Sequence, residues 1–253
     1  MERLLYNYKK FRLRNLIARQ DFNTPEFRIL EILLKDRSTI SVDAGACYGV
    51  YSVFMSKFCK RVISCEPIPL SCRLLTYQLE KNEVQNVDLH QLALSDTAGT
   101  VTMTVPATGS GLSRNYYRAE VSGQSQSKTL YGNSQSVKSI TLDKLLEGEE
   151  DCSVIKIDVE GHEKEVLEGS IKTIEKRSPA LLIEFNEPPV PKNKAFSIRT
   201  ALEKSGYICF YQGDEGKFYR WTGKTEPAGV NYYFLTEVHL DKSGDRLKKF
   251  LSV

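Results

Sequence analysis

Acidic and glycine residues follow the first strand-like run of this 253-residue chain. The run Val42-Asp43-Ala44-Gly45-Ala46-Cys47-Tyr48-Gly49 joins a predicted strand, 39–43, to a predicted helix, 48–58. Glycines at such a junction let the backbone turn sharply and let a ligand approach main-chain N–H groups. Glu66, at the end of the next predicted strand, could accept hydrogen bonds from two ribose hydroxyls. The pattern favours a nucleoside-containing cofactor over the alternative, a plain strand–helix turn followed by a surface glutamate.

The position of Asp43 narrows the type of nucleoside cofactor. Dinucleotide-binding folds carry a GxGxxG loop, in which the glycines admit the pyrophosphate close to the backbone. Here an acid stands where the first glycine would fall, and a carboxylate beside a pyrophosphate would be repelled. The same carboxylate is favourable beside the ammonium and sulfonium groups of S-adenosylmethionine. We therefore predict S-adenosylmethionine as the cofactor, with an NAD-linked oxidoreductase as the less favoured alternative.

A second set of charged residues lies in the run Ile155-Lys156-Ile157-Asp158-Val159-Glu160-Gly161-His162-Glu163. Lys156 and Asp158 share one face of a predicted strand, and Glu160 follows on the exit loop. A central parallel strand is normally almost wholly apolar, so a buried lysine and aspartate there need partners or a ligand. Glu184 ends another predicted strand and would lie at the same edge of the sheet. The alternative is that Lys156 only forms an ion pair, with Asp158 or Glu184, that holds the shape of the site.

Short β-branched runs alternate with helical patterns along most of the chain. Strands are predicted over residues 39–43, 61–66, 87–93, 154–158, 180–185, 207–211 and 232–236, and helices over 48–58, 70–81, 163–175 and 196–204. Strands that alternate with helices of this length are typical of a parallel sheet with helices on both faces. The predicted fold class is therefore a doubly wound α/β sheet, whose carboxyl edge carries the residues described above.

Two segments differ from this alternation. Residues 1–37 read as a helical N-terminal extension, followed by one domain over 38–253. Residues 1–20 carry six Lys or Arg and one Glu, and a solvated basic helix on the domain edge is favoured over a helix that binds an anionic surface. Residues 107–136 are rich in Gly, Ser and Tyr, and so predict a long loop that is either disordered or a cover over the substrate.

The composition excludes several classes of protein. With 41% hydrophobic and 26% charged residues the chain is globular, and a net charge of +3 gives no reason to expect a DNA partner. No run of roughly 18 apolar residues could span a bilayer, and the charged N-terminus is not a secretory signal, so the predicted location is cytoplasmic. The six cysteines and three histidines lack zinc-site spacing. Buried, reduced thiols and no metal site are therefore predicted.

Five motifs, taken in order, make the chain similar to a known family. They are the run 42–49, Glu66-Pro67, Ala93-Leu94-Ser95-Asp96 with Gly99, Ser139-Ile140-Thr141-Leu142-Asp143, and the run 156–163 with Leu167 and Gly169. Over residues 39–187 the sequence resembles the FkbM-type S-adenosylmethionine-dependent methyltransferases, and the run 156–163 is the most specific motif. The resemblance implies a seven-stranded, mostly parallel sheet and methyl transfer to an oxygen, usually a hydroxyl of a sugar or polyketide.

The resemblance also implies which residues bind the cofactor. The expected set is Asp43, Gly45, Ala46, Tyr48, Gly49, Glu66, Pro67, Ala93, Leu94, Ser95, Asp96 and Asp158. Within this set, Glu66 would bind the ribose, and the residues from Ala93 to Asp96 would lie near the adenine. Cys47 and Tyr48 stand where the family often has Asn and a small or apolar residue.

Methyl transfer to a hydroxyl defines what the catalytic residues must do. The step is an in-line displacement at carbon, so the acceptor oxygen has to be held about 3 Å from the methyl carbon. Because a sugar hydroxyl is barely acidic, a positioned base typically accelerates the step by about 10²–10⁴-fold. The candidates are Asp158, Glu160, Glu184 and His162, the last because histidine titrates near neutral pH. We hypothesise that Asp158 or Glu184 is the base and that Lys156 fixes its geometry.

Several alternatives stay open. The acceptor, expected to be a glycan or another small hydroxylated molecule, could also be RNA, because basic residues gather at both ends of the chain. The clustered carboxylates could hold Mg²⁺. A non-catalytic binding module is disfavoured because it would have no need for the acids Asp43, Glu66, Asp158, Glu160 and Glu184.

Overall fold

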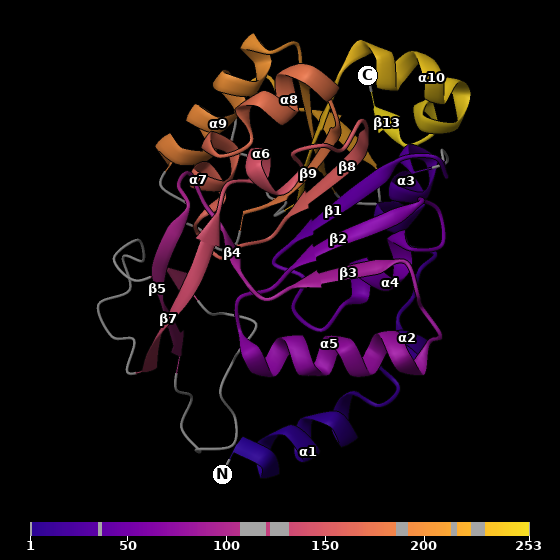
Figure 1. Cartoon of the computed structure of the whole chain (residues 1–253). Helices are drawn as coiled ribbons and strands as arrows, with labels where there is room; N and C mark the ends of the chain where they lie inside the picture. Colours follow the sequence, from indigo (N-terminus) through magenta and orange to yellow (C-terminus); the bar gives the residue numbers. More distant parts are fainter. Residues whose placement is uncertain are drawn as a thin grey trace.

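A nine-stranded sheet runs through the centre of the molecule (Figure 1). The computed structural model describes residues 2–34, 37–106, 120–121, 132–185, 192–213, 217–223 and 231–252. The strand order is β13-β11-β10-β12-β9-β8-β1-β2-β3. These strands are β1 (Ile40–Ala44), β2 (Arg61–Cys65), β3 (Val87–His90), β8 (Cys152–Ile157), β9 (Ala180–Glu184), β10 (Ile208–Gln212), β11 (Phe218–Arg220), β12 (Asn231–Leu235) and β13 (Leu251–Ser252). Each predicted strand has a counterpart among them.

Strand direction divides this sheet into two parts. β3, β2, β1, β8 and β9 are parallel neighbours, whereas β12 pairs antiparallel with both β9 and β10. The centre of the sheet is parallel, as predicted, but the prediction of seven strands is wrong. β11 and β13 extend the sheet beyond β10, and they have only three and two residues. Runs this short give no periodic pattern in a sequence.

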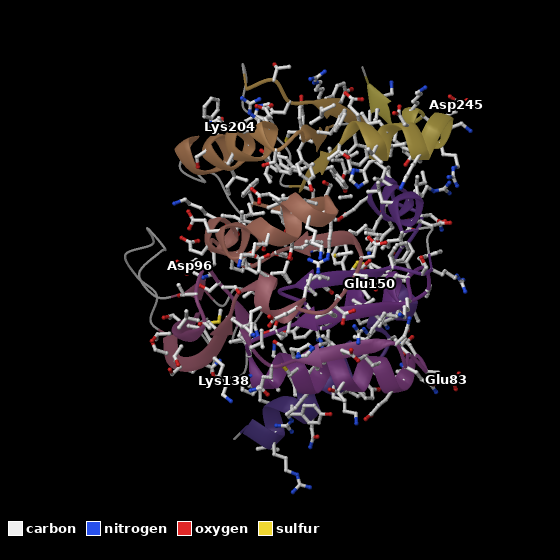
Figure 2. All side chains as sticks on the ribbon, turned by 45° about the horizontal axis from the view of Figure 1, so that its top comes forward. Glu83, Asp96, Lys138, Glu150, Lys204 and Asp245 are labelled. Carbon is white, nitrogen blue, oxygen red and sulfur yellow. The ribbon has the colours of Figure 1, made fainter. Side chains whose placement is uncertain are left out.

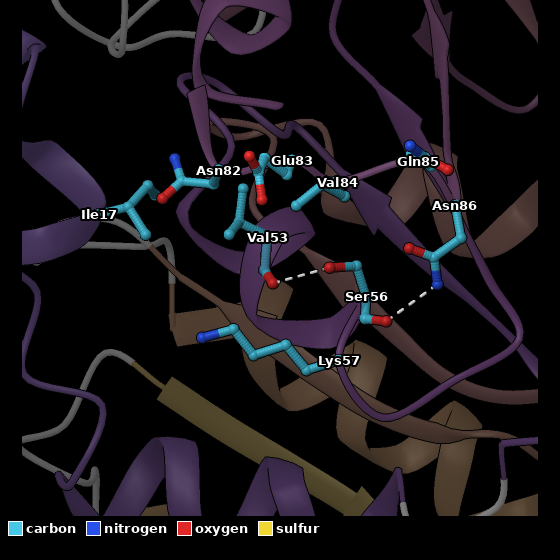
Figure 3. Close-up of a pocket in the computed structure, with 9 residues that line it drawn as sticks. All are labelled: Ile17, Val53, Ser56, Lys57, Asn82, Glu83, Val84, Gln85 and Asn86. Atoms are coloured by element: carbon cyan, nitrogen blue, oxygen red, sulfur yellow. Dashed lines mark hydrogen bonds between the residues drawn. The ribbon is translucent and has the colours of Figure 1, made fainter. Parts of the chain in front are cut away.

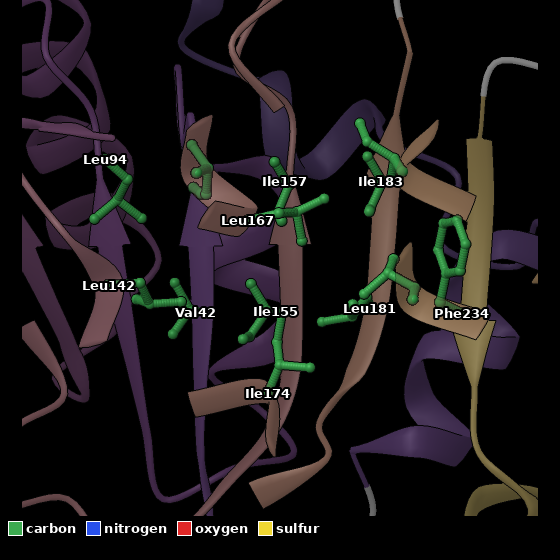
Figure 4. Close-up of a cluster of buried hydrophobic side chains, with 14 of the residues drawn as sticks. Val42, Leu94, Leu142, Ile155, Ile157, Leu167, Ile174, Leu181, Ile183 and Phe234 are labelled. Atoms are coloured by element: carbon green, nitrogen blue, oxygen red, sulfur yellow. The ribbon is translucent and has the colours of Figure 1, made fainter. Parts of the chain in front are cut away.

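Helices cover both faces of the sheet. One face is packed by α6 (Leu142–Leu145), α7 (Glu163–Glu168), α8 (Ile171–Arg177) and α9 (Lys192–Lys204). Figure 4 shows the core beneath them, where Ile155, Ile157 and Ile183 of the central strands lie with Leu142 and Leu167. Each fully buried side chain of this size contributes roughly 1.5–3 kcal/mol. This core holds β1, β8 and β9 in a fixed register, with their carboxyl ends at one edge.

The opposite face is packed by α3 (Pro25–Leu33), α4 (Val50–Met55) and α10 (Glu237–Lys248). α3 begins with Pro25 in its first turn, where the fixed φ of proline suits a helix start. Its Phe27 and Leu30 are buried in a cluster with Phe54 of α4 and Leu247 of α10. α3, which lies in the predicted N-terminal extension, therefore supplies part of the main core.

The first helix lies outside this layer. α1 (Glu2–Leu13) contacts α5 (Pro69–Lys81), and the short α2 (Leu16–Arg19) follows it (Figure 1). Leu5 of α1 is buried with Leu70 and Leu74 of α5. The Gln78 Nε2 donates a hydrogen bond to the Leu13 carbonyl at 2.8 Å, which fixes the end of α1 on α5.

A second sheet lies on the side to which the arrowheads of β1, β2 and β3 point (Figure 1). Its order is β4-β7-β5-β6, formed by β4 (Ala93–Leu94), β5 (Gly99–Pro106), β6 (Glu120–Val121) and β7 (Gly132–Ile140). The strand predicted over 87–93 is divided between β3 and β4, which belong to different sheets. The loop predicted over 107–136 is wrong at 120–121 and 132–136, which are strand, and its other residues lie outside the described part of the chain.

Charged side chains surround the folded core. In Figure 2 the labelled Glu83, Lys138, Lys204 and Asp245 lie at the periphery of the molecule. The six cysteines are free thiols, and all except the half-buried Cys47 are buried, as predicted. In the part of the chain that the structure describes, no helix combines the length and apolar character needed to cross a membrane.

Candidate active site

The loop after β1 is pressed against the loop after β8. Gly45 has a φ of 81°, a left-handed conformation that glycine adopts without strain. A Cβ at this position would lie 1.8 Å from the carbonyl oxygen of Asp158, so no larger residue fits without displacing that loop. The Asp158 N–H donates to the Ala44 carbonyl at 2.9 Å, and the N–H groups of Gly45 and Ala46 both donate to the Cys65 carbonyl. The turn at Gly45 therefore joins the ends of β1, β2 and β8.

The same loop leads into α4 through two more left-handed residues. Cys47 has a φ of 48°, and Gly49, which caps α4, has a φ of 85°. A Cβ on Gly49 would lie 2.9 Å from Cγ of Leu75 in α5. Between them, the Tyr48 hydroxyl accepts a hydrogen bond from Nζ of Lys9 at 3.3 Å. The loop is thus held by α5 and by α1 as well as by the strands.

Asp43 is buried beneath this loop and has one carboxylate oxygen to spare. It lies opposite Lys156 in the register of β1 and β8. Its Oδ2 accepts a hydrogen bond from Oγ of Ser52 at 2.6 Å, and Ser52 accepts one from Ser64 at 2.9 Å. Its Oδ1 has no hydrogen-bond partner among the described residues. Burial raises the pKa of Asp43, and the charge of Lys156 opposes that rise.

Glu66 follows β2 and holds two loops with one carboxylate. Its Oε2 accepts a hydrogen bond from the Cys47 N–H at 2.9 Å, and its Oε1 accepts one from the Ile68 N–H at 2.8 Å. Burial raises the pKa of Glu66 to about 7, although both hydrogen bonds favour the ionised form. An ionised carboxylate has about four acceptor sites, so further sites are available for hydroxyl donors. This arrangement suits the predicted ribose contact.

Lys156 lies at the centre of a group of carboxylates. Its side chain is 1% exposed, and its Nζ lies 3.0 Å from Oδ2 of Asp158 and 3.9 Å from Oε2 of Glu184. Burial by itself lowers the pKa of Lys156, but the charges of Asp158, Asp43 and Glu184 outweigh it and raise the pKa above its ordinary value. Lys156 therefore forms ion pairs with both Asp158 and Glu184, as in the alternative in which it only holds the shape of the site. They leave the Asp158 and Glu184 side chains 26% and 22% exposed, and so accessible to a ligand.

Glu184 is suited to exchange a proton near neutral pH. Burial, and after it the neighbouring Asp158 carboxylate, raise the pKa of Glu184 to about 7. A carboxylate with such a pKa is ionised in about half of the molecules at neutral pH, which is favourable for a general base.

Residues that were not predicted complete this group. The Tyr51 ring of α4 packs against Lys156, with Nζ 4.3 Å from the ring centroid. The Tyr51 hydroxyl donates to Oε1 of Glu26 in α3, which also accepts from Nδ2 of Asn231 at 3.4 Å. Tyr51 could have been suspected from its place in the helix after the glycine loop. Glu26 and Asn231 could not, because they lie near opposite ends of the chain.

Ser95 and Asp96 follow β4, where the adenine contacts are predicted. Ser95 Oγ donates to Oδ1 of Asp96 at 3.0 Å and lies 2.9 Å from Nε2 of His162. His162 is buried, and its Nδ1 lies 3.5 Å from Oε2 of Glu165. His162 therefore connects the loop after β8 to the region predicted for the adenine.

The loop after β8 has its own local constraints. Glu160 is half-buried with a left-handed φ of 48°, and the Gly161 N–H donates to Oε1 of the buried Glu163 at 2.7 Å. The single helix predicted over 163–175 is two helices, α7 and α8, with Gly169 between them. A Cβ on Gly169 would lie 2.0 Å from the Ser95 carbonyl oxygen, so the break brings this segment against the end of β4.

Most predicted site residues thus lie at one edge of the sheet. The residues whose contacts link them there are Asp43, Gly45, Ala46, Tyr48, Gly49, Glu66, Lys156, Asp158 and Glu184. The half-buried Pro67 follows Glu66, and Ala93 and Leu94 form β4, next to Ser95 and Asp96. The roles assigned to these residues stay predictions.

The site fits S-adenosylmethionine in charge and hydrogen bonding. The unpartnered Oδ1 of Asp43 is an anionic acceptor suited to a cationic group, and Glu66 retains acceptor capacity for hydroxyls. Within the described residues, no group of three or more His, Cys, Asp and Glu side chains is arranged to hold a metal ion.

A pocket of about 570 Å³ lies elsewhere (Figure 3). It is lined by Val53, Ser56 and Lys57 near the end of α4 and by Asn82 and Asn86 ahead of β3. It is therefore at the amino ends of the strands, opposite the edge that carries Asp43 and Glu66. The candidate active site is not this pocket.

One family of known proteins matches the part of the chain that contains the candidate active site. A family model described as methyltransferase FkbM domain matches residues 43–209. The match begins at Asp43 and includes Glu66, Lys156 and Glu184. No curated protein matches the chain.

Solved structures show the fold. The FkbM methyltransferase from Methylobacillus flagellatus KT is 16% identical with a TM-score of 0.52, over 78% of this chain and 44% of that one. SMU.1697c from Streptococcus mutans, in complex with SAH, is 12% identical with a TM-score of 0.50, over 85% and 99%. An rRNA methylase from Streptococcus thermophilus is 13% identical with a TM-score of 0.49, over 85% and 96%. The first two show a methyltransferase-like α/β fold, and the chain spans less than half the length of the Methylobacillus protein.

Proposed function

The chain belongs to the FkbM methyltransferase family, and from that premise we propose that it transfers a methyl group from S-adenosylmethionine to a hydroxyl oxygen of a sugar or glycan. The observation that most supports this proposal is the group formed by Lys156, Asp158 and Glu184. A buried ammonium holds two accessible carboxylates at the carboxyl edge of the sheet, where ligands of such folds bind.

The residues around the glycine loop would hold the cofactor. S-adenosylmethionine would supply a methyl group bound to a sulfonium, which departs as a neutral thioether, so the acceptor oxygen itself is the nucleophile. Asp43 would attract a cationic part of the cofactor through its unpartnered Oδ1. Glu66 would accept hydrogen bonds from the ribose, and Ser95 and Asp96 would lie near the adenine.

The carboxylates beside Lys156 would prepare the acceptor. Glu184, with a pKa of about 7, takes the proton that the hydroxyl loses as its oxygen bonds to carbon. Asp158, fixed by Nζ of Lys156 at 3.0 Å, accepts a hydrogen bond from the same or a neighbouring hydroxyl and orients it. Lys156 stays charged and keeps both acids in place.

The charge of this group favours a neutral acceptor with several hydroxyls. Glu26, Asp158 and Glu184 are partly exposed, and ionised carboxylates accept hydrogen bonds but donate none. Neighbouring sugar hydroxyls are suitable donors for such a set, whereas an anionic acceptor would be repelled. Another small polyhydroxylated metabolite would satisfy the same site.

Cofactor binding is tested by calorimetric titration with S-adenosylmethionine, S-adenosylhomocysteine and NAD. We expect the first two to bind and NAD not to, with Glu66→Gln weakening both and the exposed Glu175→Gln leaving both unchanged. Binding of NAD alone would overturn the proposal.

The acceptor is tested by transfer of a radiolabelled methyl group to separate panels of glycans, non-sugar polyols and RNA. We expect the glycans to be labelled and to keep the label after base treatment. A methyl ether formed on a hydroxyl is stable to base, whereas a methyl ester formed on a carboxylate is cleaved. Label confined to RNA, or to nitrogen, would contradict the proposal even if cofactor binding were as expected.

A further inference from the structure

Three large apolar side chains are exposed along one face of α1. Leu4, Tyr8 and Phe11 are 70%, 48% and 61% exposed. Their spacing of i, i+4 and i+7 places them in a single row along the helix. The other large apolar residues exposed in the described part of the chain, Ile171, Phe196, Tyr219 and Val238, are distributed over α8, α9, β11 and α10. The α1 row is therefore unusual in being continuous.

Basic side chains lie on both sides of this row. Residues 2–14 contain five Lys or Arg and one acid, Glu2. Arg3, Arg12 and Arg14 are exposed; at 100° per residue Arg12 and Arg3 lie on opposite sides of the row, and Arg14 follows α1 in the turn after Leu13. The Arg14 guanidinium packs over the Phe11 ring, 4.5 Å from its centroid. Apolar side chains thus occupy the centre line, and cations its margins.

The opposite face of α1 is fixed to the protein. Leu5 is buried against α5, Lys10 lies 4.4 Å from the Tyr77 ring centroid, and Gln78 binds the Leu13 carbonyl. Lys9 reaches the Tyr48 hydroxyl of the glycine loop. The exposed row is therefore carried by an anchored helix, next to the candidate cofactor site.

The exposed apolar row reverses the preference that the sequence alone gives for a merely solvated helix, and we propose that this face of α1 docks on an anionic phospholipid bilayer. In an interfacial helix, apolar side chains enter the headgroup region while flanking cations lie at the level of the lipid phosphates, which is the order found here. A second copy of the chain would bring two basic margins together, so charge repulsion disfavours a dimer through this face. A nucleic-acid surface would place cations at the centre of contact and not a row led by Leu4. Docking is measured as binding to lipid vesicles, without cofactor or acceptor, so its test is independent of the test of the proposed function.

The test is co-sedimentation of the full chain with vesicles of phosphatidylcholine alone or mixed equally with phosphatidylglycerol. We expect binding only to the mixed vesicles, and less of it at high salt. Replacing three cations, in Arg3→Gln, Arg12→Gln and Arg14→Gln together, should lower the partition coefficient by roughly 100-fold. Leu4→Ser with Phe11→Ser should lower it at least roughly tenfold, because the row can no longer enter the headgroup region.

Matched controls distinguish docking through α1 from nonspecific hydrophobic adsorption to vesicles. Ile171→Ser and Val238→Ser remove side chains that are 50% and 57% exposed and should leave vesicle binding unchanged. Tyr8→Trp should show a blue shift of its emission on mixed vesicles, which reports on α1 itself, and Val238→Trp should not. Absence of binding, equal binding to neutral vesicles, or binding that the α1 variants leave intact would overturn the proposal. So would binding to a homopolymeric RNA in place of vesicles.

Discussion

Glu66 and Glu184 are both carboxylates with a pKa raised to about 7, and they face different demands. In the proposed function, Glu66 accepts hydrogen bonds from ribose hydroxyls best when it is ionised, but burial opposes its charge. In the proposed function, Glu184 is ionised before the reaction and protonated after it. At the scale of single residues, the proposed function therefore needs one carboxylate that is ionised although it is buried, and another that changes its protonation state during the reaction.

Burial of Glu66 should make the ligand-free protein less stable at neutral and alkaline pH than at about pH 4.5. Its pKa is raised from 4.5, so the stability gained from holding it protonated is fully present below about pH 4.5 and is lost as pH rises through about 7. Glu66→Gln cannot ionise, so its stability relative to the parent should rise by on the order of 2–3 kcal/mol between pH 4.5 and pH 8. Urea unfolding at a series of pH values measures this difference.

The comparison depends only on the change with pH, because the glutamine also loses one of the two backbone hydrogen bonds at every pH. The exposed Glu80→Gln serves as the control and should show a flat difference. A flat difference for Glu66→Gln as well would contradict the assigned pKa.

Glu184 should control the pH dependence of methyl transfer. With the raised pKa of about 7, the ionised form is lost as pH falls, so kcat/KM for the acceptor should rise with pH and level off above about 7. Glu184→Gln should reduce kcat by about 10²–10⁴-fold and remove this limb, with cofactor affinity unchanged. Initial rates of Glu184→Gln and Glu175→Gln across pH test this. A normal profile in Glu184→Gln would assign the base to another residue, with Asp158 next in line.

The sequence allows the charged residues of strand ends to be predicted, because parallel strands bring their carboxyl ends to one edge. Asp43, Lys156 and Glu184 were found in this way. Tyr51 and Glu26 were not, because their contribution depends on the rotation of α4 and on the packing of α3 against it. Neither is visible in the local pattern.

At the scale of elements, the loops after β1 and β8 behave as one unit. The carbonyl of Asp158 occupies the space where Gly45 would carry a side chain, and the Asp158 N–H is bonded to Ala44. The residues predicted to bind the cofactor and those predicted to act on the acceptor are therefore spaced by backbone contact. Such contact is stiffer than one between long side chains.

Gly45→Ala should force these two loops apart. The added Cβ would lie 1.8 Å from the Asp158 carbonyl oxygen. We therefore expect the free energy of unfolding to fall by several kcal/mol and cofactor binding to become undetectable. Gly148→Ala is the matched control, because Gly148 also has a positive φ, 90°, but nothing lies within 4 Å of its Cβ. It should lose only roughly 1–2 kcal/mol. Thermal unfolding with and without S-adenosylhomocysteine compares the two, and equal losses would mean that the contact is unimportant.

The elements themselves were predictable to different degrees. Central strands such as β8 and β9 stand out because they are continuous apolar runs of the right length. β5 and β7 were not predicted. Their polar residues are mostly Thr and Ser, which make the alternation of polar and apolar residues weak, and the loop predicted over 107–136 included the start of β7. The regular exchange of Thr with Val or Met over 100–105 was the available signal.

At the scale of the whole molecule, the helices predicted as one N-terminal extension pack in different places, and we propose that the extension ends before α3. α3 packs Phe27, Ile29 and Leu30 into the main core, whereas α1 covers α5 at the edge. The sequence could identify helices in both regions. It could not distinguish a helix of the core from a peripheral one, because their apolar spacing is the same.

Two truncations distinguish these regions. Removal of residues 1–20 should leave a folded protein with a lower Tm, because the sheet and its two helix layers remain. Removal of residues 1–37 takes Phe27, Leu30 and Leu34 from the core, at roughly 2–5 kcal/mol each, and their sum is comparable to the whole stability of a typical domain. It should not fold. Size-exclusion chromatography and circular dichroism on heating test both truncated proteins. If the protein lacking residues 1–37 were a monomer that unfolds cooperatively, the boundary at residue 37 would be correct.

The second sheet begins and ends at neighbouring strands. The chain leaves the main body at Leu94 and returns at Ile140, and these two residues are paired partners in β4 and β7. The ends of the intervening segment are therefore held one strand spacing apart, about 4.8 Å. Because the entropy of closing a segment between fixed ends depends only weakly on its length, we expect insertions in this segment to cost little where they leave the buried Met103 and Val105 packed against α5. In evolutionary terms, we expect relatives to differ in the length of this segment more than in the central strands.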